Sequence, residues 1–181
     1  KGGKALCDEG GIRVPLIVQG PGVRAGSHCN TPVISYDIYP TLLDLVAPRV
    51  AMPPGIEGGS WRSLLHGGGV GAVVRPIDRL VWHHDVEIDH PQTALRQGDL
   101  KLVHYWDTKQ DFLYDLSRDL GERNNLAAQR PAQVAEMLAV LKAHVRAGLG
   151  EAKFALLEAG KFDAADGRRE RGKGKGKGAP R

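Results

Sequence analysis

The chain has 181 residues, of which 41% are hydrophobic and 24 are glycine, a composition that suits one ordinary core with many loops. No apolar run approaches the roughly 20 residues that a membrane-spanning helix needs. The net charge of +4 arises at the C-terminal end, where residues 161–181 carry eight basic and three acidic side chains. The remainder has a net charge of −1, which argues against a nucleic-acid-binding protein.

The first 22 residues combine a lysine between small residues with a short apolar run. Lys4 follows two glycines, Glu9 starts a Glu-Gly-Gly turn, and the apolar residues of 12–19 end at a Gly-Pro-Gly sequence. This pattern predicts a loop, a tight turn and a buried strand over 12–19, with Pro15 indicating an edge position or a bulge. On such a loop the ammonium group of Lys4 can contact an anion. A solvated loop lysine is the alternative.

Residues 31–47 start extended and become helical. Pro40 fits the first turn of a helix, and Ser35 or Asp37 can cap it. An active-site role is the alternative for Asp37. We expect one buried apolar stripe along this helix. Its members recur at helical spacing and are Ile38, Leu42, Leu45 and Val46.

The second half of the chain predicts a small antiparallel sheet. Residues 79–85, 93–106 and 112–116 have strand character, and the second of these contains a Gln-Gly-Asp turn at 97–99. A helix over 131–146 is expected to cover one face of the sheet with a stripe of Val134, Met137, Leu138, Leu141 and Val145. A short helix over 151–162 precedes a glycine- and charge-rich tail that we expect to be disordered.

Cys7 and Cys29 are the two cysteines of the chain. They can pair or both remain free thiols, and the sequence alone favours neither. The chain has no Cys-x-x-Cys pair and no zinc-type ligand spacing, so the sequence predicts no metal site.

Three segments resemble, in the same order, the sulfatases of the alkaline-phosphatase superfamily. The first is G-K followed by E-G-G-I-R-V-P at 9–15, the second is D-I-Y-P-T-L-L-D-L at 37–45, and the third extends through 94–103 and 113–127. The resemblance implies the C-terminal part of such an enzyme with an α/β fold. Its terminal segment of the large catalytic domain is expected at 1–66, a glycine-rich linker at 67–78, an antiparallel subdomain packed by a C-terminal helix at 79–150, and a short helix with a disordered basic tail at 151–181.

The resemblance implies hydrolysis of sulfate esters by the full enzyme. A formylglycine nucleophile and a calcium ion are expected from residues upstream of this chain, so the fragment alone is expected to be inactive. Lys4 matches the lysine that contacts the sulfate group, and Glu9 and Arg13 are expected to position its loop. Cys7 stands in C-D-E-G-G rather than in the C-x-P-x-R sequence of the formylglycine cysteine, so it is expected to be a packing residue.

Trp82 and His83 match the first two residues of the W-H-x-P region of the same family, although Asp85 replaces its proline. His83 is therefore a candidate substrate contact. The expected partner is a sulfated small molecule or glycan, and the family suggests a periplasmic or secreted location. A phosphodiesterase or phosphonate hydrolase of the same superfamily is one alternative, and a non-catalytic module that binds sulfated glycans is another.

Overall fold

The computed structural model of the chain describes residues 3, 6–85 and 90–161. The chain divides into two compact units. The sheet unit comprises Lys1–Ile12, Val81–Leu95 and Asp99–Arg181, and the helix–loop unit comprises Arg13–Leu80 and Arg96–Gly98. The domain limits inferred from the sequence stay predictions, and the expected disordered tail from residue 163 lies outside the described residues.

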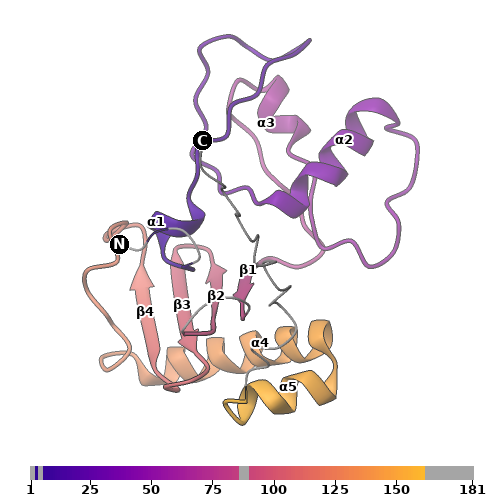
Figure 1. Cartoon of the computed structure of the whole chain (residues 1–181). Helices are drawn as coiled ribbons and strands as arrows, with labels where there is room; N and C mark the ends of the chain where they lie inside the picture. The colour runs from indigo at the N-terminus through magenta and orange to yellow at the C-terminus, as the bar shows by residue number, and fades with distance from the viewer. Residues whose placement is uncertain (1–2, 4–5, 86–89, 162–181) are drawn as a thin grey trace, which may run out of the picture. The chain divides into compact units, whose positions relative to one another are not determined.

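A four-stranded sheet forms the sheet unit, with its strands in chain order (Figure 1). The strands are β1 (Leu80–His84), β2 (Gln92–Gln97), β3 (Leu100–Tyr105) and β4 (Asp111–Asp115). β3 pairs antiparallel with β4, and Leu102 lies opposite Leu113. Gly98 has a φ of 58° in the turn between β2 and β3, a conformation that glycine adopts without strain. The predicted sheet and its turn at 97–99 are confirmed.

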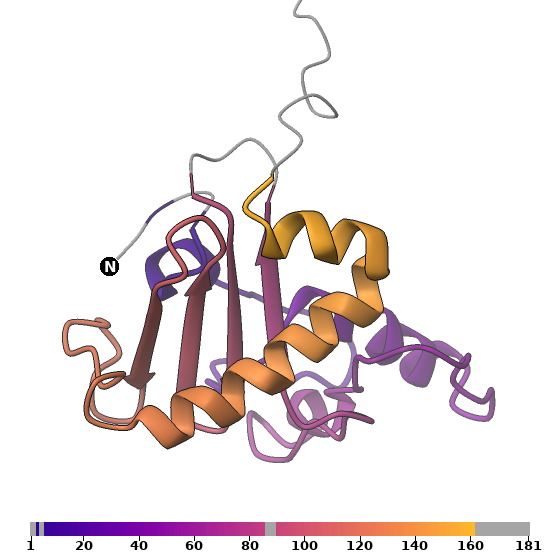
Figure 2. The same ribbon diagram turned by 90° about the horizontal axis from the view of Figure 1, so that it is seen from below.

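Helices α4 (Pro131–Leu149) and α5 (Glu151–Glu158) pack against one face of this sheet (Figure 2). The predicted apolar stripe of α4 is confirmed, because Met137, Leu141 and Val145 are buried. They form a core with the residues of the sheet and α5 that face them, namely Leu95, Leu102, Trp106, Leu113, Phe154 and Leu157. At about 1.5–3 kcal/mol for each large apolar side chain, this core is the main source of stability in the sheet unit.

The opposite face of the sheet carries a second cluster. It consists of Cys7, Ala94, Val103, Tyr114 and Leu116. β3 therefore buries side chains on both faces, since Leu102 belongs to the first cluster and Val103 to the second.

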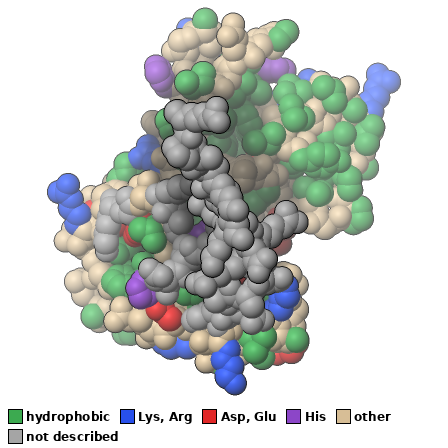
Figure 3. Space-filling view, in the orientation of Figure 1, with side chains coloured by type: hydrophobic (Ala, Val, Ile, Leu, Met, Phe, Trp, Pro, Cys, Tyr) green, Lys and Arg blue, Asp and Glu red, His purple; other side chains and the backbone are tan. Residues whose placement is uncertain are grey.

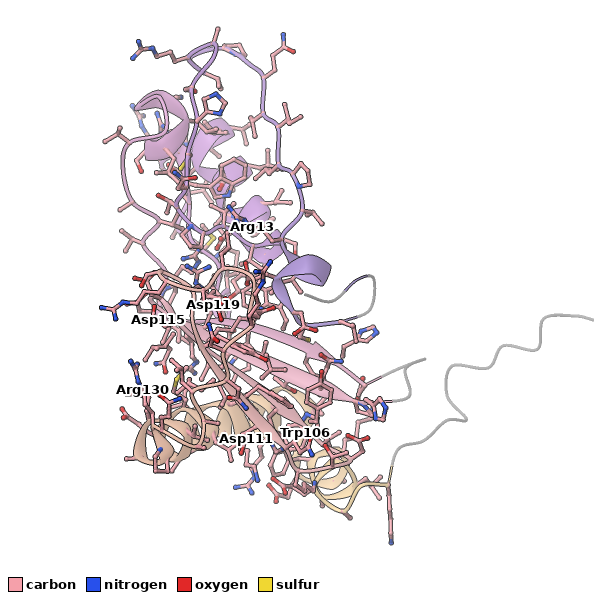
Figure 4. All side chains as sticks on the ribbon, turned by 90° about the vertical axis from the view of Figure 1, so that its left-hand side faces the viewer. Arg13, Trp106, Asp111, Asp115, Asp119 and Arg130 are labelled. Atoms are coloured by element: carbon pink, nitrogen blue, oxygen red, sulfur yellow. The ribbon has the colours of Figure 1, made fainter. Side chains whose placement is uncertain are left out.

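Figure 4 labels Asp111 and Asp115, the two ends of β4, and Trp106, which directly follows β3. The short helix α1 (Glu9–Ile12) belongs to the same unit.

The helix–loop unit contains the 3₁₀ turn η1 (Ser35–Asp37), α2 (Ile38–Val46) and α3 (Arg62–His66). The predicted α2 helix is present, but its expected apolar stripe is not buried in the described chain. Leu42 is 55% and Val46 80% exposed, whereas Pro40 and Thr41 are buried. Hydrophobic side chains gather on the surface of this unit (Figure 3). The helical spacing correctly predicted the apolar side of α2, but no segment among the described residues covers that side.

The strand expected at 12–19 is wrong for the described chain. α1 ends at Ile12, and the following residues form no strand. Their side chains are exposed, with 91% for Ile17 and 72% for Val14. A strand needs a neighbouring strand for its backbone hydrogen bonds, and none of the described residues pairs with this run.

Asp37 is fully buried and organises the helix–loop unit. Its Oδ1 accepts hydrogen bonds from the Gly59 amide and from Arg75 Nε, both at 2.9 Å, and its Oδ2 accepts one from the Ile34 amide at 2.9 Å. Asp37 occupies the cap position of α2, but its carboxylate makes no hydrogen bond to the first turn. The predicted structural role is confirmed, but the carboxylate caps the start of η1 through Ile34 instead of α2, and it also bonds to the distant residues Gly59 and Arg75.

The residues expected to form a glycine-rich linker are held to this unit by several contacts, two of which reach beyond α3. Arg75 pairs with Asp37, and Ser60 forms an isolated bridge with Val74. Leu64 of α3 is buried. Among the helices that the structure describes, none is both long and apolar enough to cross a membrane.

Candidate functional site

Lys101 is the most unusual side chain of the sheet unit, because its ammonium group is completely buried. It lies on β3 and its Nζ is 2.9 Å from Glu9 Oε1 and 2.8 Å from Glu122 Oε1. Burying a lysine is costly unless its charge is paired and its donors are used. The three residues therefore form one ion network, which we call the Lys101 network.

Glu122 connects this network to the backbone of α1. Its Oε2 accepts a hydrogen bond from the Glu9 amide at 2.8 Å, while its Oε1 lies beside Lys101. Glu122 has a φ of 53°, a left-handed conformation that costs a residue with a side chain roughly 1–2 kcal/mol. Glycine would adopt this backbone without strain, so the contacts of the carboxylate account for glutamate at this position.

A further hydrogen bond from the sheet fixes Cys7, two residues before α1. The Cys7 amide donates to Gln92 Oε1 at 3.0 Å. The Cys7 side chain is 2% exposed and packs in the second cluster. Burial raises the pKa of its thiol to about 11. Cys7 is therefore a packing residue, as its sequence context predicts, and Cys7 and Cys29 are both free.

Glycine is required where α1 meets the start of the chain. A Cβ on Gly11 would collide with the carbonyl oxygens of Leu6 and Gly3. The Leu6 amide donates to that Gly3 carbonyl at 3.1 Å. Lys4, the predicted sulfate contact, lies outside the described residues; Gly3 and Leu6, between which it stands in the sequence, are both in contact with Gly11.

The other predicted site residues lie in different surroundings. Glu9 is buried and bound to Lys101, a partner that the local sequence does not reveal, whereas Arg13 is exposed and starts the helix–loop unit (labelled in Figure 4). Their predicted role in positioning the lysine loop stays a prediction.

His83 is bound into the helix-covered side of the sheet. Its Nδ1 is 2.7 Å from Thr93 Oγ1, which also accepts a hydrogen bond from Trp106 Nε1 at 2.8 Å. Its Nε2 lies 3.3 Å from Asp85 Oδ2. Burial lowers the pKa of His83, so the ring is mainly neutral at pH 7. Trp82, the adjacent residue, instead packs against the cluster that contains Cys7. The predicted substrate contact of His83 stays a prediction.

The helix–loop unit has a shallow pocket of about 440 Å³, lined by Asp44, Ser60, Arg62 and His66 among others. Its polar groups already bond to one another. Asp44 Oδ2 accepts from Ser60 Oγ at 2.7 Å, and Arg62 Nη1 lies 3.2 Å from Asp44 Oδ1. These contacts hold the pKa of Asp44 below its usual value, chiefly through the Ser60 hydrogen bond. The Lys101 network, with its buried charges, is the stronger candidate for a functional role.

A family profile described as "N-sulphoglucosamine sulphohydrolase, C-terminal" matches residues 3–148. Arylsulfatase K of Mus musculus is 33% identical over 129 residues, which cover 68% of this chain and 23% of that protein. A sulfatase of Formosa agariphila is 35% identical over 137 residues, covering 69% of this chain and 24% of the relative. The chain thus spans about a quarter of the length of these relatives.

A solved structure described as a 2-O GAG sulfatase superposes on the chain with a TM-score of 0.52 at 27% identity. The superposition covers 65% of this chain and 25% of that structure. All of the Lys101 network falls within the range that the family profile matches. The sulfatase resemblance and the alkaline-phosphatase-like α/β fold drawn from the sequence are thus confirmed.

Proposed function

Because the chain belongs to the family of the C-terminal part of N-sulphoglucosamine sulphohydrolase, we propose that it is a segment of an enzyme that hydrolyses sulfate esters. The match over residues 3–148 carries this proposal, since it includes both the lysine loop and the complete sheet. The relatives named above include an arylsulfatase and a sulfatase of glycosaminoglycans. The proposed substrate class is therefore a sulfated small molecule or glycan.

In this proposal Lys4 supplies one positive charge to the sulfate group. During hydrolysis of a sulfate ester, negative charge is carried by the oxygens of the transferred sulfate group and develops on the leaving oxygen. A fixed ammonium group beside the sulfate stabilises that charge. Gly3 and Leu6, between which Lys4 stands in the sequence, lie against Gly11 of α1, and this contact supports the proposal. In the same proposal, the other reacting groups of such an enzyme belong to its upstream part.

The residues that the structure describes do not fit a calcium site or a formylglycine nucleophile. Within the described residues, no group of three or more His, Cys, Asp and Glu side chains could hold a metal ion. Cys7 is buried, and its raised pKa disfavours the reactive thiolate. We propose that both groups belong to the upstream part of the enzyme, and we assign no step of the reaction to them.

The test is to express the chain with the residues that precede it in its own coding sequence and to assay 4-nitrophenyl sulfate. We expect release of sulfate, and a loss of about a hundredfold or more in kcat/KM for Lys4→Ala. Lys153→Ala, which removes an exposed lysine of α5, is the matched control and should leave turnover unchanged.

Two outcomes would contradict the proposal. Preferential hydrolysis of a phosphate diester or a phosphonate ester would identify a different hydrolase of the same superfamily. Binding of a sulfated glycan without any turnover would identify a binding module. The 181-residue chain alone should show no turnover, so it serves as the negative control.

A further inference from the structure

The Lys101 network has no role in the chemistry proposed above, yet it buries one positive and two negative side chains. We propose that Lys101 and Glu122 are positioning residues: by fixing α1 on the sheet they hold Gly3 and Leu6, between which Lys4 stands in the sequence. This inference rests on the proposed function of Lys4. It assigns the C-terminal sheet a part in the arrangement of the sulfate-binding loop, at a distance of more than 90 residues along the sequence.

The first step runs from the network to α1. A helix of four residues cannot maintain its own conformation, because nucleation of a helical turn is unfavourable. Glu9, its first residue, is bound twice by the network. Lys101 Nζ donates to its carboxylate at 2.9 Å, and Glu122 Oε2 accepts from its amide at 2.8 Å. A side-chain and a backbone bond on one residue fix both the place and the rotation of α1.

The second step runs from α1 to the loop. The Gly11 and Ile12 amides donate to the Asp8 carbonyl at 2.8 and 3.1 Å, so a displacement at the start of α1 also moves these two residues at its end. Gly11 lies directly against the carbonyl oxygens of Gly3 and Leu6. A shift of α1 therefore moves the two residues that flank Lys4 and its neighbour.

The strain at Glu122 supports a positioning role. The left-handed backbone of this residue is maintained although a glycine would relieve it. Buried ion networks often contribute little net stability compared with apolar side chains of the same volume. The Lys101 network fixes the position of Glu9 through directed bonds, which apolar packing would not do.

The first experiment measures amide hydrogen exchange by NMR in the 181-residue chain. In Lys101→Met we expect the Leu6, Gly11 and Ile12 amides to exchange about tenfold faster or more, while the α4 amides keep their protection. Lys142→Met is the matched control. It breaks the 2.8 Å pair with Glu158 between α4 and α5 in the same unit and should leave these three amides unchanged.

A milder variant keeps the test decisive if Lys101→Met does not fold. Glu122→Gln retains an oxygen that can accept from the Glu9 amide but removes the charge beside Lys101. It should accelerate exchange of the same three amides to a smaller extent. Unchanged exchange at Leu6 and Gly11 in folded variants would overturn the inference. So would an equal acceleration throughout the sheet unit, because it would show a general loss of stability.

The second experiment uses the longer enzyme and a double-mutant cycle. Lys101→Met should lower kcat/KM for 4-nitrophenyl sulfate about tenfold or more, but it should have little further effect when Lys4→Ala is already present, since both act on the same contact. Additive losses would contradict a role through Lys4. Absence of turnover in the unaltered enzyme would overturn the proposed function instead, and the exchange result would still decide whether Lys101 fixes the loop.

Discussion

The two units of this chain bury their apolar side chains to very different degrees. In the sheet unit, large hydrophobic side chains of the sheet, α4 and α5 meet in one core, among them Leu102, Leu141 and Phe154. Among the described residues, all exposed large hydrophobic side chains except Leu120 and Leu156 lie in the helix–loop unit. This unit relies instead on the buried pair of Asp37 and Arg75.

The difference shows two ways in which a segment of a longer fold is held together. The sheet unit has its own apolar core, so its stability should depend on packing. The helix–loop unit keeps its conformation through polar bonds and leaves an apolar surface open, a pattern typical of a surface that meets another protein segment. The following predictions test this contrast.

The largest effect is expected in the helix–loop unit from Arg75→Met. It leaves the fully buried carboxylate of Asp37 without its counter-charge, which typically costs about 3–5 kcal/mol in the free energy of unfolding. Arg62→Met removes a pair that is 39% and 34% exposed and should cost about 1 kcal/mol or less. Urea denaturation followed by circular dichroism measures both. Equal effects of the two variants would refute the central role of Asp37.

A similar contrast is expected for leucines. Leu102→Ala removes a side chain that is completely buried in the sheet unit and should cost about 2–5 kcal/mol. Leu42→Ala removes a side chain of the same type that is 55% exposed on α2 and should change stability by about 0.5 kcal/mol or less. Urea midpoints compare the two. A large loss from Leu42→Ala would show that the apolar surface of α2 is already covered in this chain.

The two cysteines report on the two units separately. Cys29 is exposed, whereas Cys7 is buried and its pKa is raised from 9.0 to about 11. At pH 8 we expect one thiol to react rapidly with a disulfide reagent, and the second about a hundredfold more slowly, since two pKa units reduce its thiolate about a hundredfold. Cys29→Ser should remove the rapid phase. A rapid phase that remains in this variant would place Cys7 at the surface.

The smallest effect is expected from pH at His83. Burial lowers its pKa in the folded chain below the ordinary value of 6.5, so the unfolded chain binds more protons in this range. Its contribution is therefore present above pH 6.5 and is lost as the pH falls toward the folded pKa. Between pH 7.5 and 5.5, the urea midpoint should decrease more for the wild type than for His83→Asn. An equal decrease in both would contradict a lowered pKa.

Local sequence patterns were sufficient for the elements that pack within this chain. The spacing of Met137, Leu141 and Val145 predicted α4 and its buried side, and the Gly98 turn predicted the hairpin. The same reasoning failed for 12–19 and for the exposed stripe of α2. An apolar period shows which side a segment buries, but it does not show whether the covering segment is present.

The candidate site was likewise predicted only in part. The Glu-Gly-Gly sequence after Lys4 identified the segment and its family, and the family profile confirmed that family. The partners of Glu9 were not predicted, because Lys101 and Glu122 are 92 and 113 residues away from it in the sequence. The position of Lys101 between two leucines of β3 was only a weak indication of a buried charge, since charged side chains on a strand usually face water.

The sequence by itself determined the local conformations and the family of this chain, because turns, helical periods and short motifs depend on neighbouring residues. Only the tertiary structure decided what Glu9 binds, that Asp37 holds Gly59 and Arg75, and that Gly11 must lack a side chain. The positions of these residues in the sequence do not indicate that they lie close together in space. Burial then makes those pairings obligatory, because a charge or an amide removed from water has to find its partner within the fold.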